Sequence, residues 1–170
     1  WAELKACCDC IGFGLVQTAP GGLEKVNAAT REKDPARWAA SVKVISDILA
    51  RHRPQVILFP HDTDWNSSHI GTHHLVMDAL RTLPAEFQTW AVETEFWGAM
   101  TSPNLMVELS ATDLADLITA LTFHVGEVQS RGRLVEDVRG SSGRATGKLR
   151  CQLDALRLTA RKRRSGLAEP

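Results

Sequence analysis

The sequence predicts an α/β domain, layered around a mainly parallel β-sheet. Short apolar runs rich in β-branched and aromatic residues, the clearest at 56–59, alternate with longer segments whose apolar residues recur at helical spacing. Hydrophobic residues make up 44% and charged residues 24% of the 170 residues, as in ordinary globular domains. This length is sufficient for one domain with a substantial core.

The first part of the chain predicts mainly helices. A helix is expected over residues 1–10, with an apolar face at i, i+3, i+4 and i+7, and a short strand over residues 13–16. Residues 23–31 predict a short helix or an ordered loop. Asp34 as N-cap and Pro35 at the first helical position then begin a clear helix that ends near residue 52.

Residues 56–74, with the sequence VILFPHDTDWNSSHIGTHH, carry the densest chemical signal. A buried parallel strand is expected at 56–59, followed by a polar loop and by a helix that Ser67 or Ser68 caps. Because ligands in open α/β sheets bind beyond the carboxyl ends of the strands, this loop is the candidate site. Four of the six histidines of the chain lie in this stretch, namely His61, His69, His73 and His74.

The second half of the chain divides into an ordered part and a basic tail. Strands are expected at 87–96 and at 105–109, and a helix from 111 to about 129, with Thr112 near its N-cap and His124 in its carboxyl half. The predicted domain thus comprises residues 1–128, and 129–170 form a tail expected to be weakly ordered. Residues 131–170 contain 11 basic and 4 acidic residues, against 9 and 16 in residues 1–130.

The cysteines do not predict a disulfide framework. Cys7, Cys8 and Cys10 crowd one predicted helix, where adjacent thiols do not pair easily, and Cys151 lies in the tail. Their spacing differs from that of a zinc knuckle, so free thiols are favoured over a metal site.

Three segments carry a resemblance to one enzyme family. Residues 2–4 and 11–13, AEL and IGF, look like the remainder of a family helix. Residues 53–80, RPQVILFPHDTDWNSSHIGTHHLVMDAL, look like its strand, metal loop and following helix. Residues 94–128, TEFWGAMTSPNLMVELSATDLADLITALTFHVGEV, look like its later strand and histidine-bearing helix. Together they resemble the LmbE-like, PIG-L-type zinc-dependent deacetylases, which remove acetyl groups from N-acetylglucosamine conjugates.

The resemblance implies a Rossmann-like α/β domain that uses zinc to hydrolyse the amide of an N-acetylated sugar conjugate, with release of acetate. His69 matches the family's third zinc ligand. His124 matches the catalytic histidine of its late helix, which contacts the substrate or its oxyanion. Asp64 is expected to act beside them as a catalytic, site-lining residue, and Trp65 and Asn66 to bind the substrate.

The sequence also departs from the family pattern. The family's His-Pro-Asp-Asp-Glu motif does not occur, and Asn66 and Ser68 stand where a later motif has a histidine and an aspartate. The resemblance therefore implies a chain without the family's first strand, two of its three metal ligands and its catalytic carboxylate. His61, Asp62 and Asp64 are the residues able to supplement His69 on the same loop. Because catalytic zinc usually takes three protein ligands, we expect this chain to bind zinc weakly and to deacetylate little or nothing.

Each candidate residue also has a plainer interpretation. His69 can cap or pack the loop, Asp64 can be a solvated acid, Trp65 a packing anchor, and His124 a histidine satisfied in the core. His73 follows His69 at helical spacing, but without a glutamate between them the pair is weak evidence for zinc. A role in supporting a metal ligand or in helix packing is expected instead. His74 is expected at the surface.

The alternative function is that of a non-catalytic remnant or binding module whose basic tail, with RKRR at 161–164, contacts nucleic acid or another acidic partner. Nucleic acid is the less favoured partner, because no recognised binding motif and no interleaved aromatic residue accompany the charges. No signal peptide and no apolar run of roughly 18–20 residues occur, which predicts a cytoplasmic protein without a membrane partner. An unpaired sheet edge would favour a homo-oligomer.

Overall fold

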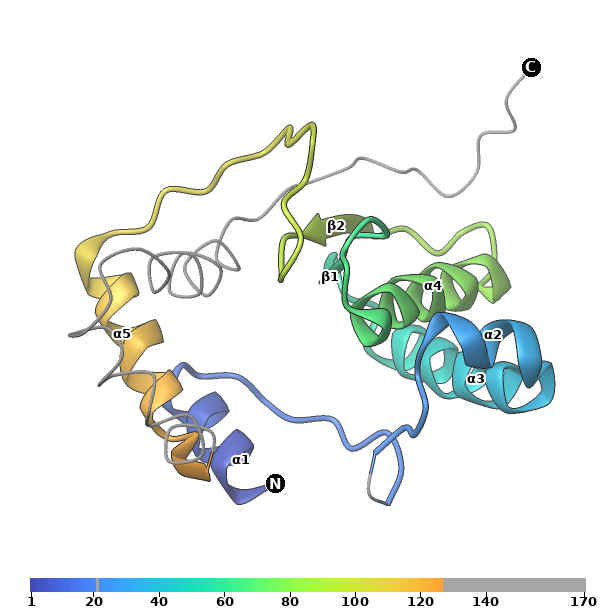
Figure 1. The fold of residues 1–170 in the computed structure, drawn as a ribbon, viewed down its shortest axis with the longest axis horizontal. Helices are drawn as coiled ribbons and strands as arrows, with labels where there is room; N and C mark the ends of the chain where they lie inside the picture. Colours follow the sequence, from blue (N-terminus) through green and yellow to red (C-terminus); the bar gives the residue numbers. More distant parts are fainter. Residues whose placement is uncertain (21, 127–170) are drawn as a thin grey trace. The chain divides into compact units, whose positions relative to one another are not determined.

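The computed structural model describes residues 1–20 and 22–126, which form two compact units (Figure 1). The larger unit contains residues 18–20 and 22–106, and the smaller contains residues 1–17 and 107–126. The predicted tail from residue 129 onward lies outside the described residues. Within the described ranges, no helix is long and apolar enough to cross a bilayer.

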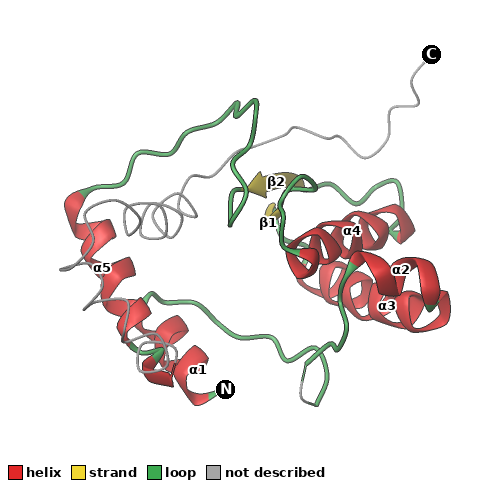
Figure 2. Ribbon diagram, viewed as in Figure 1, coloured by secondary structure: helices red, strands yellow, loops and turns green. Residues whose placement is uncertain are grey.

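The larger unit is a β–α–β arrangement with helices on one face of a two-stranded parallel sheet (Figure 2). Strands β1 (Val56–Pro60) and β2 (Trp90–Thr94) pair in register from one end to the other. Helix α4 (Ser67–Thr82) connects them and packs against β1, while α3 (Pro35–His52) packs against α4. The short helix α2 (Ala28–Lys33) contacts both α3 and α4.

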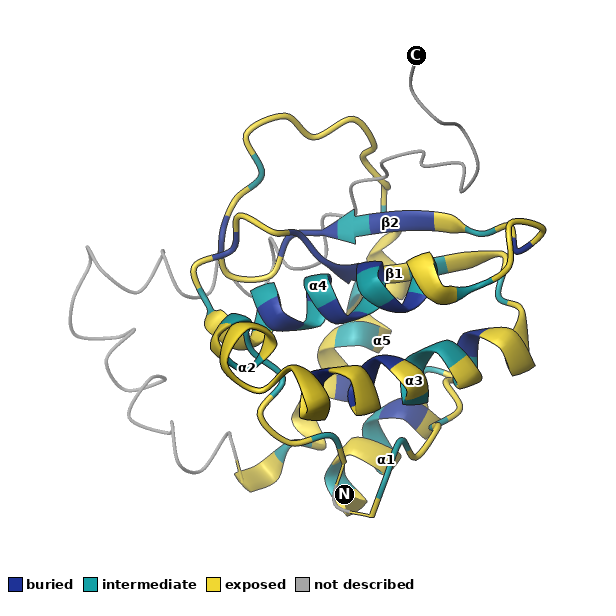
Figure 3. Ribbon diagram, turned by 90° about the vertical axis from the view of Figure 1, so that its right-hand side faces the viewer, coloured by how far each residue is buried: buried dark blue, intermediate teal, exposed yellow. Residues whose placement is uncertain are grey.

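The core of this unit lies between α3, α4 and the sheet. Figure 3 shows the buried residues along the facing sides of the two helices and along the strands. In β1, Ile57 and Phe59 face the helices while Val56 and Leu58 are half exposed, because successive side chains of a strand point to opposite faces. The helical contributions recur at i, i+4 and i+7 spacing, and the central buried residues are Trp38, Val42, Leu49, Leu75, Ala79 and Phe87.

Side-chain caps determine where the helices begin. Asp34 caps α3 as predicted, accepting the backbone N–H of Arg37. The predicted cap of α4 is wrong: the side chain of Asn66, not of Ser67 or Ser68, accepts the first backbone N–H groups of this helix. An N-cap oxygen reaches the backbone N–H groups two and three residues later. Asn66 precedes Ser68 by two residues and His69 by three, so its side chain reaches the N–H groups of both.

The smaller unit pairs α1 (Ala2–Cys10) with α5 (Ala111–Thr122). Ser110 caps α5 in a reciprocal capping box with Asp113, so the cap lies two residues before Thr112, near the predicted position. The Glu3 carboxylate of α1 accepts the backbone N–H of Gly126 at 2.9 Å, which ties α1 to the segment beyond α5.

Three secondary-structure predictions are corrected. Residues 13–16 and 105–109 are not strands, because a strand needs a partner for its backbone groups and the sheet of the described residues has only β1 and β2. Helix α5 ends at residue 122, so His124 lies in the turn beyond it and not within a helix. The parallel pairing and the mixed α/β character are confirmed for the described part of the chain.

A partly buried carboxylate joins the three helices of the larger unit. Asp78 on α4 accepts two hydrogen bonds from the guanidinium of Arg31 on α2, at 2.8 and 3.1 Å, and one from the indole N–H of Trp38 on α3, at 3.0 Å. Burial raises the pKa of Asp78, but the hydrogen bonds from Arg31 and Trp38 and the charge of Arg31 outweigh it and hold this pKa below its ordinary value.

We expect Asp78→Ala to lower the free energy of unfolding by about 2–3 kcal/mol, because a hydrogen bond to a charged group contributes about 1.5–3 kcal/mol. The matched control is Asp47→Ala, which removes an exposed ion pair with Lys43 on α3 and should cost less than about 1 kcal/mol. Chemical denaturation at neutral pH measures both. Equal losses would show that Asp78 does not join the helices.

Candidate functional site

The candidate site forms where the loop after β1 meets the segment after β2, and a single carboxylate connects the two. Asp64 Oδ2 accepts the backbone N–H groups of Trp97 at 2.8 Å and Gly98 at 3.0 Å. Its Oδ1 accepts the N–H of Asn66 at 2.7 Å. The carboxylate is fully buried, with 0% of the side chain exposed, so the interpretation of Asp64 as a solvated loop acid is wrong.

The environment of Asp64 favours its charged form. Burial raises the pKa of this carboxyl, but the backbone N–H groups of Asn66, Gly98 and Trp97, together with His69, outweigh burial and place the pKa below its ordinary value. A carboxylate saturated with donors and already ionised is a poor proton acceptor. The geometry therefore favours Asp64 as a positioning group and not as a general base.

His69, in the first turn of α4, lies against this carboxylate. Its Nδ1 is 3.2 Å from Asp64 Oδ1, close enough for an ion pair, although the contact lacks the angle of a hydrogen bond. The ring also packs against Phe96 and Trp97, with ring centres 5.0 and 5.5 Å away. Because Nδ1 is buried beside Asp64, a metal ion would have to bind His69 through Nε2. A carboxylate behind the second nitrogen is the usual support of a metal-binding histidine.

Beside His69 lies a partly exposed group of aromatic side chains, Trp65, Phe96 and Trp97, which we call the aromatic wall. The Trp65 indole N–H donates to the backbone oxygen of Trp97 at 2.7 Å, and the two indole rings are 5.1 Å apart. Trp65 is nevertheless 67% exposed. This residue is thus anchored through its polar edge while most of its ring surface faces outward. It therefore serves as a packing anchor and still offers a ring surface on which a substrate could stack.

Gly98 allows these groups to approach one another. A Cβ atom at this position would lie 3.0 Å from Asp64 Cα and 3.2 Å from Trp65 Cδ1, closer than side chains normally come. The absence of a side chain therefore lets the backbone of the second segment reach the carboxylate of the first.

His61 is unsuitable as a supplementary metal ligand, because both of its ring nitrogens are engaged. Its Nε2 lies 2.8 Å from the carbonyl oxygen of Gly98, which can only accept, so we assign the proton to Nε2. Nδ1 then accepts from the backbone N–H of Thr63 at 3.2 Å and from its hydroxyl at 2.8 Å. The ring is buried and acts as a second link between the two segments.

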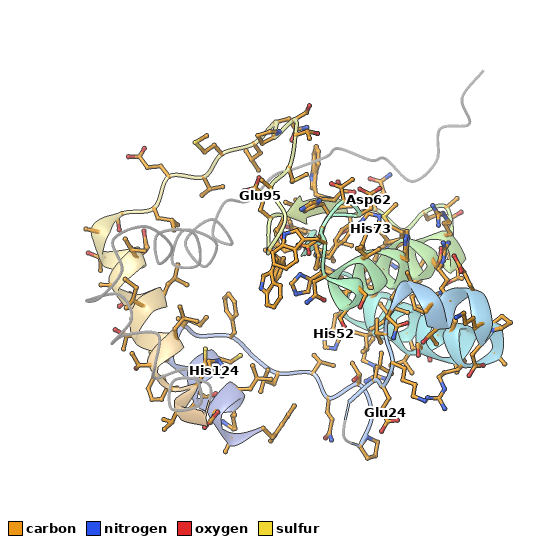
Figure 4. All side chains as sticks on the ribbon, viewed as in Figure 1. Glu24, His52, Asp62, His73, Glu95 and His124 are labelled. Carbon is orange, nitrogen blue, oxygen red and sulfur yellow. The ribbon has the colours of Figure 1, made fainter. Side chains whose placement is uncertain are left out.

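The two following histidines lie deeper in the fold. His73 is buried on α4, with Nδ1 3.2 Å from the carbonyl oxygen of Pro60 and its ring against Phe59, which confirms the predicted packing role (Figure 4). His74 is half-buried, so it lies only partly at the surface where it was expected. Burial, the charge of Arg31 and the neighbouring His73 lower the pKa of His74.

The larger unit thus brings together Asp64, Trp65, Asn66 and His69. Asn66 is used as the helix cap, so its side-chain oxygen is occupied by the backbone N–H groups of Ser68 and His69. His124 belongs to the smaller unit, where it is half-buried and its N–H donates to the backbone oxygen of Leu121 at 3.1 Å (Figure 4).

These residues meet the requirements of a zinc site only in part. The pair of Asp64 and His69 fits one supported ligand. No group of three or more histidine, cysteine, aspartate or glutamate side chains able to hold a metal ion occurs in the part of the chain that the structure describes. The described residues therefore do not complete a zinc site.

Comparisons with protein-family models, with curated proteins and with solved structures find no match for this chain.

Sequence reasoning missed the contribution of the segment after β2. Phe96, Trp97 and Gly98 received no role, although they surround His69 and Asp64. A signal was present, because the carboxyl ends of parallel strands meet at one edge of a sheet, which places residues directly after the second strand beside the loop after the first.

We expect Asp64→Asn to lower the free energy of unfolding by about 1–3 kcal/mol, because the amide NH₂ replaces an acceptor and leaves buried N–H groups unpaired. The control is Asp62→Asn, an exposed neighbour, which should change stability by less than about 0.5 kcal/mol.

The lowered pKa of Asp64 means that its stabilisation is present above the unfolded value near 3.8 and is lost as the pH falls below it. Denaturation between about pH 6 and 3 should therefore show a smaller acid loss in Asp64→Asn than in the unmodified chain.

Proposed function

We propose that this chain belongs to a zinc-dependent hydrolase of the N-acetyl-sugar deacetylase type, in which the larger unit presents His69 to the metal and the aromatic wall to the sugar. The observation that carries the proposal is the pair formed by Asp64 and His69 at the carboxyl edge of the parallel sheet. The sequence around this pair is also the segment with the best resemblance to that family.

Each part of the site has a task in such a reaction. Zinc, when bound, would polarise the amide carbonyl and activate water. Asp64 holds the ring of His69 in place, so that Nε2 is the nitrogen offered to the metal. The exposed ring of Trp65 offers a flat apolar surface of the kind on which the apolar face of a pyranose stacks. His124 is proposed as a substrate or oxyanion contact on the family resemblance alone.

The same geometry supports weak activity for this chain. The described residues offer one supported ligand where catalytic zinc usually has three. Further ligands and a catalytic base would have to come from outside these residues. Because the family's His-Pro-Asp-Asp-Glu motif does not occur in the sequence, we propose that the 170 residues alone bind zinc weakly and release little acetate. The alternative of a nucleic-acid-binding tail rests on residues 131–170, which lie outside the described residues.

Zinc titration with a competing chelator tests the metal role of His69. We expect His69→Ala to lower the zinc affinity of the chain by at least about 10–100-fold, since loss of a mere supporting residue already costs that much. The matched control is His74→Ala, which removes a histidine of the same helix and should leave zinc affinity unchanged. Zinc binding that survives His69→Ala would remove the basis of the proposal.

Titration with N-acetylglucosamine tests the sugar role of the aromatic wall. Binding is monitored through the nuclear magnetic resonance shifts of the indole N–H groups. Titration should move the Trp65 signal, and Trp65→Ala should abolish binding. Trp90→Ala is the control, because Trp90 is an exposed tryptophan of β2 that does not belong to the wall. Shifts confined to signals other than those of Trp65 and Trp97 would contradict this part.

A further inference from the structure

A buried carboxylate beside the aromatic wall has no task in the reaction proposed above. Glu95 follows directly after β2, at the carboxyl edge of the sheet, and only 7% of its surface is exposed (Figure 4). Glutamate is seldom buried this deeply unless hydrogen bonds or an opposite charge compensate it. Here Oε1 accepts the backbone N–H of Met100 at 2.7 Å. The carboxylate thus closes a turn formed by residues 95–100, which we call the wall turn.

The wall turn carries the residues of the second segment that meet the loop after β1. The backbone N–H groups of Trp97 and Gly98 donate to the carboxylate of Asp64 at 2.8 and 3.0 Å. The rings of Phe96 and Trp97 pack against His69, with ring centres 5.0 and 5.5 Å away. Two of the three aromatic residues of the wall therefore take their positions from this turn.

The two ends of the wall turn are held in different ways. Before its start, the parallel ladder continues to Thr94, whose carbonyl oxygen accepts the backbone N–H of His61 at 3.3 Å. At its end, the bond from Met100 to Glu95 returns the chain to the edge of the sheet. A hydrogen bond to a charged acceptor is about twice as strong as one to a neutral acceptor. Loss of the carboxylate therefore weakens the hold on the far end of the turn, while Asp64 still binds its centre.

We propose that Glu95 is the positioning residue of the aromatic wall. By closing the wall turn, it keeps Phe96 and Trp97 in the arrangement that receives the sugar. The functional part of this inference rests on the sugar role proposed above for the wall. The closure itself is a property of the protein without ligand, so the two parts can be tested separately.

Closure of the turn determines what fraction of the molecules is ready to bind. When only a fraction has the competent arrangement, the apparent Kd is the intrinsic Kd divided by that fraction. A hydrogen bond to a charged group shifts an equilibrium by about 10–100-fold. Removal of the Glu95 carboxylate is expected to act at the lower end of this range, because Asp64 still holds the centre of the turn.

Nuclear magnetic resonance of the indole N–H groups of the full 170-residue chain, recorded without sugar, tests the closure. Glu95→Ala should shift or broaden the signals of Trp65 and Trp97, because the indole N–H of Trp65 donates to the carbonyl oxygen of Trp97 within the turn. The signal of Trp38, whose indole N–H donates to Asp78 in the core, should stay in place.

Three further variants separate closure from other effects. Met100→Pro deletes the donor N–H, leaves the carboxylate intact and should change the spectrum as Glu95→Ala does. Glu95→Gln retains an acceptor oxygen and should restore the spectrum of the unmodified chain. Glu93→Ala is the matched control and should leave the spectrum unchanged. It removes a half-buried carboxylate of the same strand, whose Oε1 lies 3.7 Å from Nδ1 of His73 on α4.

Addition of N-acetylglucosamine to the same samples tests the functional part. The Kd should rise about 10-fold in Glu95→Ala and Met100→Pro and stay close to that of the unmodified chain in Glu95→Gln and Glu93→Ala. Unchanged Trp65 and Trp97 signals in Glu95→Ala and Met100→Pro, or a Glu95→Gln variant as impaired as Glu95→Ala, would overturn the positioning role.

Two other outcomes are equally decisive. Displacement of the Trp38 signal in Met100→Pro as well as in Glu95→Ala would overturn the assignment, since the bond would then support the whole unit and not the wall in particular. The expected spectra together with no sugar binding by the unmodified chain would overturn the functional part and the sugar role of the wall. Closure of the turn by Glu95 would then still stand, so the two failures remain distinguishable.

Discussion

The buried carboxylate of Asp64 is the constraint on which the candidate site depends. A buried charge is costly unless hydrogen bonds compensate it, and here three backbone N–H groups do so. One donor comes from Asn66 in the same loop, and the other two come from residues 33 and 34 positions later in the chain. The need to compensate one charge thus joins two segments that the parallel pairing of β1 and β2 has already brought to the same edge.

The other features of the site follow from this junction. Because Trp97 is held through its backbone N–H, its carbonyl oxygen is in position to accept the Trp65 indole N–H. His69 is then confined between the Asp64 carboxylate and two aromatic rings. Gly98 makes the close approach possible, and His61 adds a second link to the carbonyl oxygen of Gly98. The site is therefore a coupled set of contacts in which the functional candidate, His69, has little freedom to turn.

Helix α4 connects this site to the core. Its first turn carries His69, and its later turns carry the buried residues Leu75 and Ala79 together with Asp78, which joins α2 and α3. A helix anchored along one face holds its amino-terminal residues in a defined position. This rigidity is what a metal-binding or substrate-binding histidine requires, and it supports the proposed role even though one ligand does not make a zinc site.

The sequence by itself determined the features that depend on neighbours along the chain. The start of α3 followed from Asp34 and Pro35, the strand β1 from its apolar run, and the packing of His73 from its place on the helix face. Tertiary structure decided what depends on distant partners. It decided that Asp64 is buried and ionised, that Phe96 and Trp97 lie beside His69, and that residues 105–109 are not a strand. The physical reason is that a buried carboxylate or a candidate strand needs hydrogen-bond partners that lie far away in the chain. The local sequence pattern does not show whether those partners are present.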